Sequence, residues 1–337
     1  MDTHHTMTVE ERNLKSSWDC CPSEYLDRYL VSGVQDPRIN GQSILTRALL
    51  ADALYPGRFD ARIAEELRFG AVLTWILQQL EKGVTRYELL DAIESDRPAH
   101  VPEFICKTYA WLQDKACPIP DYITAALSCL DYDLPRHCLS DLALDTFMAI
   151  WSEQLSQTPA AAISVLEVAC GSANDHRFLH KSGLVRCLSY TGIDITAGNI
   201  ANARRHYPNA DFRAQSILTT ELPDSSYDYL FCHDLIEHLS LVAMERALGE
   251  MFRIAQNEVI LHFFNGKWAG DHEVVPVRRY YRNRVSMEKV TTFFERLGAR
   301  VTCLEMAQWF QEKIGSPGYH NPNAFSMIVE RQVGLAK

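Results

Sequence analysis

The sequence predicts an α/β domain preceded by an all-helical segment. From Ser23 to about Gln157, apolar residues recur at the spacing of helices. After Thr158, short β-rich runs alternate with helical patterns, which is the arrangement of a parallel sheet with both faces covered. The 337 residues also exceed what one compact domain usually holds. We therefore expect a helical lid or dimerisation domain at residues 1–157 and an α/β domain at residues 158–337.

The composition is that of a globular protein, with 47% hydrophobic and 23% charged residues. A formal net charge of -10 disfavours a nucleic-acid-binding surface, and no apolar run reaches the roughly 18 residues of a membrane span. The segment Met1–Thr8 lacks the apolar run of a signal peptide, and the 10 cysteines form no CxxC pair. We expect a cytoplasmic protein with reduced cysteines, no metal site, and neither nucleic acid nor a membrane as partner.

The helical segment contains one specific local signal. Thr85 stands three residues before Glu88, the spacing of a capping box that starts a helix. The stretch from Ala71 to Glu94 also has the helix-turn-helix look of a winged-helix or dimerisation module. Ordinary helix packing explains this stretch equally well, so a homodimer is an open possibility.

The α/β segment begins with an apolar strand that runs into a turn of small residues. Val165 to Val168 form the strand, Ala169 to Ala173 form the turn, and a helix follows at Arg177–Lys181. Small side chains there let the backbone approach a ligand at the carboxyl edge of a sheet. Asp194 ends the next strand, where a carboxylate can accept hydrogen bonds from both hydroxyls of a ribose.

Two further strands follow in the order that such a domain needs. The third, Ala210 to Ala214, leads to Ser216 and Ile217, and the fourth leads into the phrase His233 to Leu239. In this order the segments resemble the class I S-adenosylmethionine (SAM)-dependent methyltransferases, over about the C-terminal half of the chain. The resemblance implies a Rossmann-like, mostly parallel seven-stranded sheet, with SAM as cofactor and the run Ala324 to Glu330 as the last, antiparallel strand.

The resemblance also assigns residues to the cofactor. Glu167 would lie below the methionine portion, Asp194 would hold the ribose, and Ile195 would cover the adenine. The residues implied as cofactor-binding are Glu167, Ala169, Cys170, Gly171, Ser172, Asp194, Ile195, Ser216, Ile217 and His233.

The chain departs from the family pattern at two places. Gly171 alone remains of three glycines, with Ala169 and Ala173 at the outer positions, and Ser216 stands where relatives often have an acidic residue. These departures leave the angle of the ligand open. A nicotinamide cofactor also stays possible, although the lost glycines and the phrase Glu237-His238-Leu239 disfavour it.

Methyl transfer depends mainly on positioning and exclusion of water, and a base is needed only when the acceptor arrives protonated. We expect His233, Asp234 and Glu237, after the fourth strand, to be catalytic. Further candidates lie around the fifth strand, namely His262, Asn265, Asp271 and His272. A Pro-Pro-aromatic motif, typical of enzymes that methylate bases or glutamine, is missing after the fourth strand, so a small-molecule acceptor is favoured.

A lid is expected from aromatic and basic residues outside these motifs. Its candidates are Tyr25, Tyr29, Arg278, Tyr280 and Tyr281, the last three in an insertion at residues 266–284. Two other functions stay open at this stage. One is another SAM-consuming enzyme of the same fold, in which a carbon of the methionine chain is attacked and methylthioadenosine is released. The other is a binding or regulatory protein.

Overall fold

The computed structural model describes residues 40–57, 162–277, 280–315 and 321–332, together with isolated positions from 63 to 88 (63, 64, 67, 68, 75, 79, 82–85 and 88). None of the helices within these ranges has the length and apolar character needed to cross a membrane. The cysteines within them, at 170, 187, 232 and 303, are free thiols.

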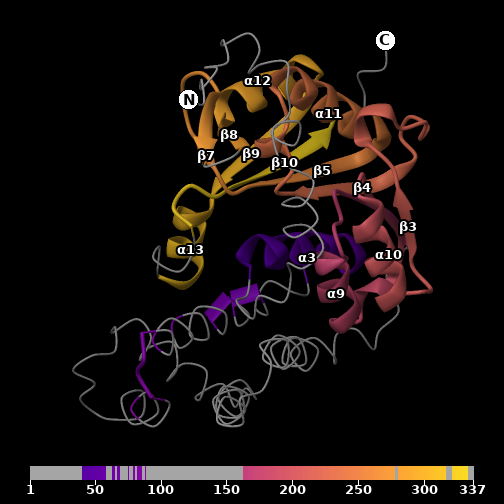
Figure 1. The fold of residues 1–337 in the computed structure, drawn as a ribbon, viewed down its shortest axis with the longest axis horizontal. Helices are drawn as coiled ribbons and strands as arrows, with labels where there is room; N and C mark the ends of the chain where they lie inside the picture. Colours follow the sequence, from indigo (N-terminus) through magenta and orange to yellow (C-terminus); the bar gives the residue numbers. More distant parts are fainter. Residues whose placement is uncertain are drawn as a thin grey trace, which may run out of the picture.

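A seven-stranded sheet forms the core of the described C-terminal part of the chain (Figure 1). Its order is β3-β2-β1-β4-β5-β10-β9, and β10 runs antiparallel to both of its neighbours, while the pairs from β3 to β5 are parallel. This confirms the predicted mostly parallel sheet and its antiparallel last strand. The strands are β1 (Ile163–Val168), β2 (Leu188–Asp194), β3 (Asp211–Ala214), β4 (Tyr227–His233), β5 (Ala255–Phe263), β9 (Ala299–Glu305) and β10 (Phe325–Arg331).

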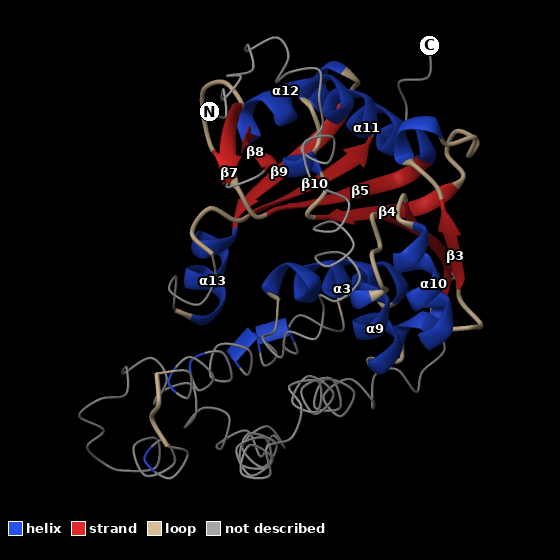
Figure 2. Cartoon of the chain, viewed as in Figure 1, coloured by secondary structure: helices blue, strands red, loops and turns tan. Residues whose placement is uncertain are grey.

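Helices cover both faces of the sheet (Figure 2). On one face lie α11 (Leu241–Ile254) and α12 (Met287–Arg296), and on the other lie α3 (Gly41–Leu54), α9 (Asn174–Lys181), α10 (Ala197–His206) and α13 (Met306–Ile314). Short 3₁₀ turns, η3 (Leu184–Cys187), η4 (Ile217–Thr219) and η5 (Ile236–His238), complete the connections. Helix α9 begins earlier than the expected Arg177, directly after the small-residue turn.

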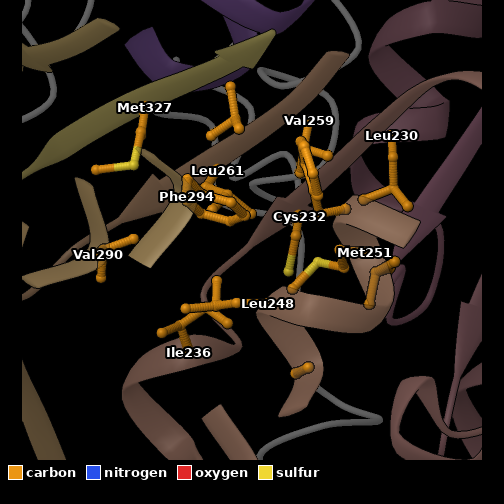
Figure 3. Close-up of a cluster of buried hydrophobic side chains, with 14 of the residues drawn as sticks. Leu230, Cys232, Ile236, Leu248, Met251, Val259, Leu261, Val290, Phe294 and Met327 are labelled. Atoms are coloured by element: carbon orange, nitrogen blue, oxygen red, sulfur yellow. The ribbon is translucent and has the colours of Figure 1, made fainter. Parts of the chain in front are cut away.

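Neighbouring strand residues enter different hydrophobic cores, because side chains alternate between the faces of a strand. Val165 and Phe231 belong to the core below α3, α9 and α10, whereas Leu166 and Leu230 belong to the core below α11 and α12. Figure 3 shows the second core, with Leu230 close to Met251 of α11. Hydrophobic residues therefore pack on both faces of the sheet. A polar ligand is expected to bind at the carboxyl edge of the strands.

Helix α3 is attached directly to the sheet. The Gln42 side-chain amide donates hydrogen bonds to the carbonyl oxygens of Phe263 (3.2 Å) and Phe325 (2.8 Å). Gly41 lies against the ring of Phe310, so closely that an added Cβ would come within 2.0 Å of Cζ. Since the carboxyl end of β5 pairs with the beginning of β10, α3 lies beneath the ligand-facing end of the sheet.

The insertion after β5 forms a small second sheet. It contains β6 (Gly266–Lys267), β7 (Glu273–Val277) and β8 (Tyr280–Ser286), in the order β6-β8-β7. The Asn283 amide of β8 donates to the carbonyl oxygens of Ile236 (3.3 Å) and Leu239 (2.5 Å). The insertion thereby fixes the loop that follows β4.

The predicted capping box is confirmed. The Thr85 backbone N–H donates to the Glu88 carboxylate (2.8 Å), and the Glu88 N–H donates to the Thr85 hydroxyl (3.3 Å). In the same way, Ser240 and Ser286 accept backbone hydrogen bonds at the first residues of α11 and α12.

Candidate active site

The turn between β1 and α9 is left-handed at every second residue. Ala169, Gly171 and Ala173 have φ values of 60°, 53° and 74°. The two alanines thus adopt the conformation that the missing glycines would adopt, at a cost of about 1–2 kcal/mol each. No atom lies within 4 Å of a Cβ built on Gly171, so the turn is open on that side.

Asp194 holds this turn in place. Its Oδ2 accepts a hydrogen bond from the Gly171 N–H (3.1 Å), and its Oδ1 accepts from the Thr196 N–H (2.7 Å) and, more weakly, from the Asn199 amide (3.5 Å). A carboxylate has about four acceptor positions. One remains for a ribose hydroxyl, and the long Asn199 contact is readily exchanged for a second.

The next residue presents an apolar surface beside this carboxylate. Ile195 is 73% exposed, which is unusual for isoleucine and fits a residue that covers an aromatic ring. Ser216 caps η4 through its hydroxyl, which accepts from the Leu218 N–H (3.2 Å), and keeps a second lone pair. The Ile217 side chain is buried in the hydrophobic core, so it packs the site from within.

Glu167 lies buried beneath the turn. The Tyr190 hydroxyl donates a hydrogen bond to its Oε2. Burial, and secondarily the charge of Asp175, raise the pKa of the Glu167 carboxyl well above its usual range, although the hydrogen bond from Tyr190 opposes this. Cys170 is also buried, and Ser172 donates from its hydroxyl to the Asn199 side-chain oxygen (3.3 Å). The floor of the turn is therefore fixed by internal contacts.

The loop after β4 divides the predicted catalytic residues between two environments. Asp234 is exposed, has a left-handed φ of 48°, and contacts Nε2 of His238 through its carboxylate (3.3 Å). Glu237 is buried, and its Oε1 accepts from the backbone N–H groups of Phe264 (2.6 Å) and Asn265 (3.3 Å). Burial, with a smaller contribution from Asp234, raises the pKa of Glu237 to about 7. Glu237 thus joins the β4 loop to the end of β5.

His233, the last residue of β4, faces the other side of the sheet. Its Nδ1 lies 2.8 Å from Oδ2 of Asp175, in the first turn of α9, as a close ion-pair contact and not a linear hydrogen bond. The Ser43 hydroxyl of α3 donates to the other oxygen, Asp175 Oδ1 (2.6 Å). Burial raises the pKa of Asp175, but His233, Ser43 and Arg47 outweigh this effect and lower it.

His262 of β5 stacks on His233, with ring centroids 4.0 Å apart and planes at 10°. Unlike His233, it has partners on both ring nitrogens: Thr46 of α3 at Nε2 (2.6 Å) and Ser326 of β10 at Nδ1 (2.8 Å). The Ser326 hydroxyl donates onward to the Met306 sulfur (3.0 Å), so Nδ1 of His262 carries the proton and Thr46 donates to Nε2.

The predicted lid residues are only partly placed. Tyr25, Tyr29 and Arg278 lie outside the described residues, and Tyr280 is described by its backbone in β8 only. Tyr281 is half-buried on β8. The assignment of these residues to a lid stays a prediction.

Sequence reasoning missed the contribution of α3 and of Asp175. Ser43 and Asp175 are 132 positions apart, and Thr46 and His262 are 216 positions apart, so no local pattern links them. Asp175 also lies in the first turn of a helix. A carboxylate is common there because it interacts favourably with the helix dipole, so its position did not indicate a role in the site. The one feature of the sequence that pointed to this cluster was the position of His233 at the end of a predicted strand.

These residues fit a bound SAM molecule. The open turn at Gly171 gives the ligand backbone contact, Asp194 has free acceptor capacity for ribose, and Ile195 offers an apolar face for adenine. Ser172 belongs to the same turn, Glu167 is buried beneath it, and the Ser216 hydroxyl caps η4. SAM supplies an electrophilic methyl group on a sulfonium.

Comparison with known proteins gives one match to a family model. Residues 165–258 match the family model described as a methyltransferase domain. A SAM-dependent methyltransferase from Methanosarcina mazei is 16% identical, with 51% of this chain and 93% of that chain covered and a TM-score of 0.38. One from Aquifex aeolicus is 18% identical, with 51% and 84% covered and a TM-score of 0.37. The cyclase SpnF is 15% identical, with 58% and 83% covered and a TM-score of 0.39. No curated protein sequence matches significantly.

The match to the family model covers the strands that carry the turn, Asp194 and His233. The structure adds the strand order with the antiparallel β10 between β5 and β9. The C-terminal half of this chain is therefore a SAM-dependent transferase domain that resembles the class I methyltransferases, with SAM as its cofactor.

Proposed function

We propose that this chain is a SAM-dependent methyltransferase that acts on a small-molecule acceptor. The observation that carries the proposal is the joint placement of Asp194 and Gly171 at the end of β2 and β1, bonded through Asp194 Oδ2 and the Gly171 N–H. In such a fold this is where a ribose and a methionine portion meet. We expect the reacting sulfonium on the side of His233, which ends β4, the strand next to β1.

Two observations support a small acceptor. Elements from two parts of the chain contact the strand ends: Ser43 of α3 bonds to Asp175, and Asn283 of β8 bonds to the loop after β4. The net charge of -10 also disfavours a nucleic-acid substrate. Elements packed around the strand ends favour methyl transfer, because the reaction benefits from exclusion of water from the sulfonium.

The experiment has a binding part and a product part. Calorimetry on the full chain should show binding of SAM and of S-adenosylhomocysteine, with NAD as the control ligand. The protein is then incubated with SAM and a panel of small amines, thiols, phenols and carboxylic acids, and the products are identified by mass spectrometry. S-adenosylhomocysteine together with an acceptor heavier by one methyl group supports the proposal.

Two results would contradict it, each in a different way. Tight NAD binding without SAM binding would overturn the cofactor. Methylthioadenosine above the non-enzymatic background, in place of S-adenosylhomocysteine, would keep the cofactor and show attack on the methionine chain.

A further inference from the structure

His233 and His262 form a stacked pair whose members differ in one respect. Both nitrogens of His262 have partners, Thr46 and Ser326. Both ring nitrogens of His233 are buried without a hydrogen-bond partner among the described residues, and Nδ1 alone has an ion-pair contact, with Asp175 (2.8 Å). Because a buried nitrogen without a partner is costly, such an atom is usually retained where a ligand or a reaction uses it.

The proton on His233 is placed by Asp175. Burial works against ionisation of Asp175, but its neighbours His233, Ser43 and Arg47 lower its pKa, so at neutral pH it is a carboxylate that can only accept. Since Asp175 Oδ2 lies 2.8 Å from Nδ1, the proton of a neutral His233 belongs on Nδ1. The lone pair is then on Nε2, which contacts neither Asp175 nor another polar atom of the described residues.

The N-terminal helix α3 holds this carboxylate. The Ser43 hydroxyl donates to Oδ1 of Asp175, and Arg47, which is fully buried, adds a positive charge beside it. Gln42 anchors the same turn of α3 to β5 and β10. Residues of three elements, Ser43 of α3, Asp175 of α9 and His233 of β4, are thus in contact.

We propose that His233 is the base that takes the proton of the acceptor, that Asp175 is its positioning residue, and that α3 completes the site by holding Asp175. This inference rests on the proposed function. The acceptor atom forms a bond to the methyl carbon while its proton moves to Nε2 of His233. The electron pair of the broken carbon–sulfur bond stays on sulfur, and the proton on His233 returns to solvent after the product leaves.

The first test reads the proton position without any turnover. The full chain, labelled with ¹⁵N in its histidines and saturated with S-adenosylhomocysteine, is studied by NMR, and His233→Gln assigns the resonance. Wild-type His233 should be the Nδ1–H tautomer. In Asp175→Asn, the Ser43 hydroxyl keeps the amide oxygen on its own side, so the amide NH₂ faces Nδ1 and should move the proton to Nε2. An Nε2–H tautomer in the wild-type protein would overturn the proposal.

The second test uses the acceptor found with the panel of amines, thiols, phenols and carboxylic acids. Asp175→Asn should lower the rate of single turnover roughly 10²- to 10⁴-fold, the usual contribution of a positioned base, with SAM affinity within about twofold. Asp228→Asn is the matched control, because it makes the same change in another carboxylate that accepts a serine hydroxyl, that of Ser164 (2.7 Å), near the beginning of β4 and away from Asp175. It should keep the wild-type tautomer of His233.

The outcomes separate the two proposals. If the panel gives no methylated product, the proposed function fails, and the NMR measurement still decides whether Asp175 sets the tautomer. If turnover occurs and Asp175→Asn is as fast as wild type, or Asp228→Asn is equally slow, the base assignment is wrong while the methyltransferase function stands.

Discussion

Replacing Asp194 by alanine tests the cofactor site most directly. The substitution removes the acceptor for the Gly171 N–H (3.1 Å) and the Thr196 N–H (2.7 Å), as well as the expected acceptor for ribose. Hydrogen bonds to charged groups contribute about 1.5–3 kcal/mol each, but part returns when the freed amides meet water. We expect the free energy of unfolding to fall by about 1–2 kcal/mol and SAM binding to weaken by about 1–3 kcal/mol, or roughly 5- to 150-fold.

Two measurements separate these effects. Thermal unfolding without ligand reports the loss of the turn contacts, and calorimetry well below the melting temperature reports the affinity for SAM. Asp224→Ala is the control, since it removes the same charge from a side chain that is 77% exposed and lies before β4, at the opposite edge of the sheet. If folded Asp194→Ala binds SAM within twofold of the wild-type affinity, the assignment of Asp194 to the ribose is refuted.

Three further outcomes follow from the structure. Ile195→Ala should weaken SAM binding in calorimetry. It should change the free energy of unfolding by less than about 0.5 kcal/mol, because the side chain is 73% exposed. An unchanged SAM affinity would show that Ile195 is not part of the cofactor site. Gly41→Ala should lower the free energy of unfolding by about 1–3 kcal/mol in chemical denaturation, because its Cβ would come within 2.0 Å of Phe310. Gly249→Ala inside α11 is the control. Its Cβ would lie 3.8 Å from the nearest ring, so it should be neutral or stabilising by up to about 1 kcal/mol. Burial raises the pKa of Glu237 to about 7, so its ionisation opposes folding and the free energy of unfolding should fall as pH rises from about 4.5 to 7. In urea titrations, Glu237→Gln should make this dependence on pH shallower. An unchanged dependence would show that Glu237 does not titrate in this range.

The order of elements in the C-terminal half was available from the sequence. The runs around Val165, Ile193 and Leu230 are strands because apolar and β-branched residues cluster there, and the small residues from Ala169 to Ala173 could only form a tight turn. The structure confirms the parallel sheet, the antiparallel last strand and the capping box at Thr85. These features depend on contacts within one element or on the shared direction of parallel strands.

The roles within the β4 loop were not determined by their order in the chain. His233, Asp234 and Glu237 are near neighbours in sequence, yet His233 contacts Asp175, Asp234 contacts His238, and Glu237 bonds to the backbone of β5. Successive residues of a strand and of the turn after it point in different directions. A cluster in the sequence was therefore three separate environments in space.

The sequence by itself determined the fold class and the positions of the turn and of Asp194, because short-range periodicity and turn chemistry specify them, and the resemblance to the class I methyltransferases added the cofactor. Only the tertiary structure decided that α3 lies beneath β5 and β10, with Gln42 bonded to a carbonyl 283 positions away. It also decided that Ser43 and Asp175 meet, and that of two stacked histidines only His262 has both nitrogens satisfied. Such contacts are made by side chains from distant segments after the sheet has assembled, and no local pattern of residues encodes them.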